Sequence, residues 1–233
     1  MQSEMEILII AAVSVAGLHT LTGPDHYVPF IALSKSRSWS IGKTIGWTII
    51  CGSGHVLSSV LLGLGGAALG WSLSELSWLE NIRGGIAGWV MLAFGFLYGI
   101  WGLYRAMSNN PHKHFDLQEN GDIYVYQHNH SVPIPPKERY KVTPWVMFLI
   151  FILGPCEPMI PLLYFPAAQN SWIGMSMLIG IYTLVTLSTM LLLVGLGYYG
   201  IAFIKTDKIE RYVHALGGLT ILICGAGMLW MGW

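Results

Sequence analysis

The sequence has few charged residues. Aspartate, glutamate, lysine and arginine make up 10% of the 233 residues, whereas hydrophobic residues make up 54%. Because soluble domains carry about 25% charged residues, the composition excludes an ordinary soluble protein and predicts an all-α membrane protein. The formal net charge is zero, so no nucleic-acid partner is expected and the lipid bilayer is the expected surrounding.

Cysteine is also scarce, and its number is odd. Cys51, Cys156 and Cys224 all lie in apolar runs, which argues against a disulfide framework. The N-terminal residues include Glu4 and Glu6 but no lysine or arginine. This is not the basic start of a cleaved signal peptide, so we expect the first apolar run to remain in the mature protein.

Long apolar runs dominate what is present. Each is long enough for a membrane span, which needs roughly 20 residues, and they cover residues 5–34, 41–70, 84–104, 145–168, 171–203 and 213–232. As one straight helix, the first run would be about 45 Å long, against a hydrocarbon core of roughly 30 Å. We therefore expect six transmembrane helices, the first of them broken near Gly23-Pro24.

Basic residues predict the orientation of these helices. Arg83 falls in the second loop, while the other eleven lysines and arginines lie in or beside the first, third and fifth loops. The positive-inside rule then places those three loops in the cytoplasm and both termini outside. For a bacterial cytoplasmic (inner) membrane, the termini would face the periplasm.

The two halves of the sequence resemble each other. Three short segments recur at offsets of 131, 130 and 133 residues: Gly23-Pro24-Asp25-His26 with Gly154-Pro155-Cys156-Glu157, Leu57-Ser58-Ser59 with Leu187-Ser188-Thr189, and Gly84-Gly85 with Gly217-Gly218. Three spans in each half make the repeat inverted, with helices 1 and 4 broken. The expected organisation is a first repeat (1–105), a cytoplasmic loop (106–143) and a second repeat (144–233).

The first break carries residues that bind metals. His19 and His26 are two helical turns apart on one face, and Asp25 precedes His26. Ionisable groups inside a membrane are by default a functional hypothesis. Imidazole and carboxylate suit nickel, cobalt, zinc or iron, so the stretch predicts a cation site.

Three further residues are candidate ligands from other spans. His55 follows Gly52-Ser53-Gly54 in the second span, where small residues allow close helix packing. Cys156 and Glu157 lie in the proline-rich break of the fourth span. Cys156 would be a soft ligand as a thiolate or a neutral packing residue, and Glu157 a ligand or a proton carrier.

The third loop contains four histidines that form a second candidate metal site: His112, His114, His128 and His130. Asn120-Gly121, between two short runs, is a typical hairpin turn, and a hairpin would bring the two pairs of histidines to the same end. Short histidine-rich tracts bind metal in some proteins, while the alternative is a solvated cytoplasmic loop.

The first break also resembles a known signature. Nickel permeases of the hydrogenase and urease accessory type carry a histidine, a glycine four residues on, and Asp-His six and seven residues on, as at His19, Gly23, Asp25 and His26. The chain is similar to the broader nickel/cobalt transporter superfamily, in which Gly54-His55 resembles a second motif. The resemblance implies that His19, Asp25, His26 and His55 are substrate ligands.

These features together predict a transporter rather than an enzyme. The expected substrate is a divalent transition metal, nickel or cobalt foremost, bound near the midplane between the repeats, with no prosthetic group. A homo-oligomer is left open. The alternatives are a thiol-redox protein that uses Cys156, similar to cytochrome c biogenesis transporters, and a metal-sensing accessory protein. Export of a sulfur anion ranks last, because no lysine or arginine is expected deep in a span.

Overall fold

The computed structural model describes residues 2–107, 113–117, 123–127, 142–156, 158–168, 172–202 and 207–231. Within these ranges the chain forms helices and one β-hairpin, in the order α1 (Gln2–Thr22), η1 (Pro24–His26), α2 (Val28–Ser36), α3 (Ile41–Ala68), α4 (Leu73–Met107), β1 (Lys113–Leu117), β2 (Ile123–Gln127), α5 (Val142–Leu153), α6 (Met159–Ala168), α7 (Trp172–Ala202) and α8 (Asp207–Trp230).

Five of the described helices are long and apolar enough to cross a membrane, and they are α1, α3, α4, α7 and α8. The fourth apolar run forms two shorter helices, α5 and α6, where the sequence predicted one broken span. A helix of 12 residues such as α5 is about 18 Å long, which is too short to cross the bilayer alone. The chain is therefore a helical integral membrane protein with a divided fourth run.

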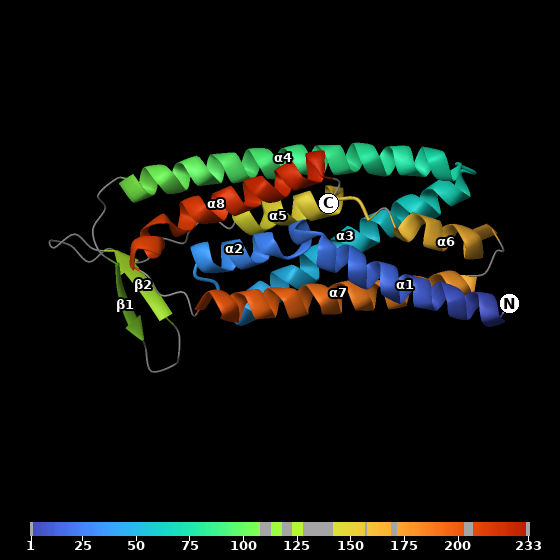
Figure 1. Cartoon of the computed structure of the whole chain (residues 1–233), viewed down its shortest axis with the longest axis horizontal. Helices are drawn as coiled ribbons and strands as arrows, with labels where there is room; N and C mark the ends of the chain where they lie inside the picture. Colours follow the sequence, from blue (N-terminus) through green and yellow to red (C-terminus); the bar gives the residue numbers. More distant parts are fainter. Residues whose placement is uncertain are drawn as a thin grey trace.

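The first apolar run is broken where the sequence predicted. Helix α1 ends at Thr22, a 3-10 turn covers Pro24–His26, and α2 begins at Val28. Proline ends the helix because it lacks an N–H and its ring clashes with the preceding turn. Both broken runs, α1–α2 and α5–α6, follow the long axis of the bundle and are interrupted near its middle (Figure 1).

Helix α4 corrects one expectation, because it begins at Leu73 and not near residue 84. Ser72 and Glu75 form a capping box: the Ser72 N–H donates to Glu75 Oε2 at 2.7 Å and the Glu75 N–H to Ser72 Oγ at 3.4 Å. Arg83, expected in a loop, consequently lies within the helix, and its side chain is only 18% exposed. Arg83 therefore lies in a helix that is long and apolar enough to cross a membrane, where the sequence placed it in a loop.

The third loop contains the predicted hairpin. Strands β1 and β2 pair in antiparallel fashion, with Leu117 opposite Ile123 and His114 opposite Tyr126. The turn itself, at 118–122, lies outside the described residues.

Helices α4 and α8 make the most extensive contact of the bundle, and they lie side by side in Figure 1. Glycines let their backbones approach closely. A Cβ on Gly95 would lie 2.7 Å from the Cα of Leu222, and a Cβ on Gly225 would lie 2.8 Å from the Cα of Leu92. Small residues are typical of tightly packed membrane helices, since apolar side chains gain little by leaving lipid.

Replacing Gly95 with alanine should therefore destabilise the protein. Overpacking of this kind costs about 1–3 kcal/mol, which outweighs the roughly 1 kcal/mol that alanine gains over glycine in a helix. The measurement is thermal unfolding in detergent. Gly85→Ala is the matched control, because nothing lies within 4 Å of a Cβ at that position of the same helix. Equal unfolding temperatures for the two variants would contradict this packing.

Candidate metal centre

The turn between α1 and α2 is built around Gly23. A Cβ at this position would lie 2.7 Å from His26 Nδ1 and 2.9 Å from Asp25 Oδ1, so only glycine fits without displacing both side chains. The Gly23 N–H donates to the His19 carbonyl at 2.9 Å, and the His26 N–H donates to the Gly23 carbonyl at 3.1 Å. The break thus folds the Asp25 and His26 side chains against their own backbone.

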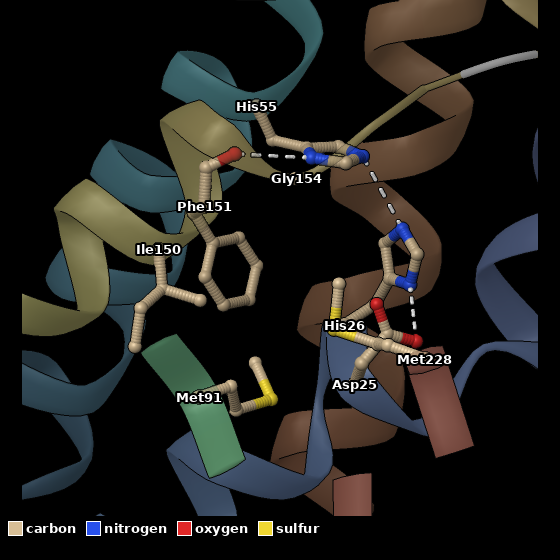
Figure 2. A pocket seen from close by; sticks show the side chains of 8 residues that line it. All are labelled: Asp25, His26, His55, Met91, Ile150, Phe151, Gly154 and Met228. Carbon is tan, nitrogen blue, oxygen red and sulfur yellow. Dashed lines mark hydrogen bonds and ion pairs between the residues drawn. The ribbon is translucent and has the colours of Figure 1, made fainter. Parts of the chain in front are cut away.

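His26 and His55 face each other across the core. Their Nε2 atoms are 3.3 Å apart and the ring planes are nearly perpendicular. Both residues are almost completely buried, at 2% and 3% exposure. On the far side of each ring, Nδ1 of His55 lies 3.2 Å from the Phe151 carbonyl and Nδ1 of His26 lies 3.1 Å from the Gly23 carbonyl. Figure 2 shows the two imidazoles end to end.

These distances constrain where the ring protons are. Carbonyl oxygens only accept hydrogen bonds, so we assign the ring proton of neutral His26 and of neutral His55 to Nδ1, which donates it. In the neutral rings both Nε2 atoms are then lone-pair acceptors, which repel each other at 3.3 Å. A stable contact requires a positive charge between them, either a proton or a metal ion.

His19 adds a third imidazole from α1. Its ring centroid lies 4.7 Å from that of His26, in an edge-to-face arrangement. One ring nitrogen from each of His19, His26 and His55 lies within 4.8 Å of the others. Nε2 of His19 is buried and has no hydrogen-bond partner. A buried ring nitrogen without a partner, in a residue next to the facing His26 and His55 rings, is an arrangement that a cation would satisfy.

Asp25 lies behind His26 and not among the facing nitrogens. Its Oδ1 is 3.2 Å from His26 Nδ1, and the residue is 8% exposed. A carboxylate on the outer nitrogen of a histidine fixes the ring and raises its basicity, as the outer-shell partners of metal sites do. In this structure Asp25 orients His26 and places a negative charge beside the three imidazoles.

A small cavity adjoins the histidines. Its lining includes Asp25, His26 and His55 together with two thioethers, Met91 from α4 and Met228 from α8 (Figure 2). Its volume of about 10 Å³ has room for one water-sized particle. The cavity fits an ion and excludes an organic solute in this conformation. The sequence did not single out either methionine, because isolated methionines in apolar spans are usually packing residues.

The structure places Cys156 apart from the three histidines. Its Sγ lies 3.4 Å from the Tyr182 hydroxyl, and its N–H donates to Ser59 Oγ at 3.2 Å. Cys156 is fully buried and does not belong to the described lining of the cavity. Glu157, the other ligand expected from the fourth run, lies outside the described residues.

The predicted second metal site falls mostly outside the described residues. His112, His128 and His130 lie outside the described residues, and of His114 only the backbone in β1 is described. The second metal site therefore stays a prediction.

No protein-family model, curated protein or solved structure matches the chain.

The proton positions can be tested directly by nitrogen-15 NMR of protein labelled at histidine, with His26 and His55 assigned by replacement with glutamine. We expect protonated Nδ1 atoms in both rings, because each faces a carbonyl oxygen. A neutral ring protonated only at Nε2, in either residue, would contradict the geometry described above.

Proposed function

We propose that the protein transports a divalent transition-metal cation, nickel or cobalt foremost, through a site formed by His19, His26 and His55. The observation that carries the proposal is the contact between the Nε2 atoms of His26 and His55, which are 3.3 Å apart. The Nδ1 atom of each ring already faces a backbone carbonyl. Ligand nitrogens about 2 Å from a tetrahedral metal ion lie roughly 3.3 Å apart. The two imidazoles are thus spaced as a pair of ligands would be.

The surroundings also favour a metal ion over a purely structural cluster. Asp25 and the Phe151 carbonyl hold the outer nitrogens of His26 and His55, as outer-shell groups hold metal-binding histidines. The thioethers of Met91 and Met228 line the adjoining cavity and are weak, soft donors. Zinc and iron suit the same donors; the resemblance to nickel/cobalt transporters is the reason for placing those metals first.

The proposed inverted repeat, with three spans in each half, is the architecture of transporters whose two halves alternate. A Cβ on Gly17 would lie 3.8 Å from Val185, and a Cβ on Gly54 would lie 3.0 Å from Phe148. The offset of the Gly-Pro segments is 131 residues, and the same offset takes Gly17 to Phe148 and Gly54 to Val185. Each contact is therefore the counterpart of the other. Correspondingly, α1 packs on α7 as α3 packs on α5.

The proposed orientation has support from the arrangement of the helices. Helices α2 and α4 end, and α3 begins, at the same end of the bundle (Figure 1). Lys35, Lys43 and Arg105 lie on these three helix ends. This basic end would face the cytoplasm, and both termini would be external in a bacterial inner membrane.

The thiol-redox alternative finds less support. Such a relay exchanges electrons through pairs of cysteines, and Cys51, Cys156 and Cys224 are all buried and free of disulfides. Replacing Cys156 with serine should leave metal binding intact under the transport proposal. If the protein is a metal sensor that acts through the third loop, deletion of 112–130 should abolish its function.

The experiment is a titration of the purified protein with Co²⁺, followed by visible absorption, and then metal flux in proteoliposomes. His26→Ala and His55→Ala should each weaken Co²⁺ binding by more than about tenfold, because loss of a ligand should cost more than loss of the outer-shell partners that cost 10–100-fold. Flux should fall in the same two variants.

His214→Ala is the matched control, since this buried histidine contacts Tyr98 on α4 and lies outside the group of three. It should bind and transport the metal as the unaltered protein does. Undiminished binding and flux after removal of both His26 and His55 would reject the proposal.

A further inference from the structure

Arg83, on α4, binds the C-terminal end of α5 close to the site. Its Nη2 donates to the carbonyls of Ile152 at 2.8 Å and Gly154 at 3.2 Å, and to Ser58 Oγ at 2.7 Å. Its Nη1 forms an ion pair with Glu80 at 2.6 Å. One guanidinium therefore connects α4 to both α3 and the end of α5.

The carbonyls that Arg83 binds are those that the break of the fourth run leaves without helical partners. Helix α5 ends at Leu153. The Cys156 N–H, which would be the helical partner of the Ile152 carbonyl, donates to Ser59 Oγ instead, and Pro158 has no N–H for the Gly154 carbonyl. No water is available in the hydrocarbon to satisfy such groups. A positive charge at a helix C-terminus also interacts favourably with the helix dipole. Arg83 thus stabilises the free end of α5.

The same end of α5 holds His55. The Phe151 carbonyl, one residue before Ile152, accepts the Nδ1 proton of His55 at 3.2 Å. Ser58 makes a second link, because its hydroxyl accepts from Arg83 and donates to the His55 carbonyl at 2.8 Å. Arg83 therefore reaches the His55 ring through α5 and the His55 backbone through α3.

Keeping the Arg83–Glu80 ion pair inside the membrane is costly. Glu80 is completely buried, and charged residues within spans are retained mostly where they serve function. The planar fork of arginine matches the task, since it donates to two carbonyls, a hydroxyl and a carboxylate at once, which a lysine ammonium cannot do in this geometry.

We infer that Arg83 is a positioning residue for the cation site: it fixes the C-terminal end of α5 and thereby the orientation of His55 toward His26. The inference rests on the proposed function. It predicts that loss of Arg83 changes the affinity and the coordination geometry of the site, although Arg83 does not touch the ion.

The test is Co²⁺ titration of purified protein, with the visible absorption band as the report of coordination geometry. Arg83→Gln should weaken Co²⁺ binding about tenfold, the lower end of outer-shell effects, and alter the band. Arg83→Lys should give an intermediate affinity. Arg105→Gln is the control: it also removes a charge from α4, but this arginine stacks on Trp101 in the last turn of the helix.

Ser58→Ala provides a milder second variant, since it removes only the link through α3. If Arg83→Gln does not fold, the Arg83→Lys and Ser58→Ala variants decide: weaker binding with a changed band supports the inference, and unchanged binding and band overturn it. Absence of Co²⁺ binding in the unaltered protein would overturn the proposed function itself, which distinguishes the two failures.

Discussion

The contact between His26 and His55 depends on the two helix breaks. Each break exposes backbone carbonyls in a medium where water cannot satisfy them. Imidazole N–H groups supply some of the hydrogen bonds that these carbonyls need: His26 donates to the Gly23 carbonyl at the first break, and His55 donates to the Phe151 carbonyl at the second. Because both Nδ1 atoms are used in this way, both Nε2 atoms are left to face each other. The breaks and the proposed cation site are therefore one structural feature.

The buried carboxylate of Asp25 also favours a positive charge between the histidines. Asp25 is almost fully buried, and a carboxylate in a low-dielectric interior is costly unless a positive charge lies close by. Neutral imidazoles cannot provide that charge, and Arg83 is already paired with Glu80. A positive charge held between the histidines, either a proton or a metal ion, would balance Asp25 and remove the repulsion between the Nε2 atoms together.

Local signals in the sequence predicted the breaks, because Gly-Pro interrupts helices. They also identified His19, His26 and His55 as candidate ligands, because histidine is rare inside spans. The role of Asp25 was not predictable: adjacency to His26 suggests a shared ligand set, and only the tight turn at Gly23 places the carboxylate behind the ring. Arg83 was misplaced because hydropathy alone sets the start of α4 too late. The capping box at Ser72 and Glu75 marks the true start.

The two halves satisfy their breaks differently, and this difference bears on transport. At the first break the donor is the ring of His26, which also faces the site. At the second break the His55 ring donates to the Phe151 carbonyl, and the fixed charge of Arg83 donates to the next carbonyls, of Ile152 and Gly154. The bonds from His55 and Arg83 to α5 join residues of the first half to the second half. If the halves alternate as proposed, these bonds change, and a change in the Phe151 bond reorients His55. Under the proposed function, movement of α5 and affinity for the ion are therefore coupled through a single imidazole.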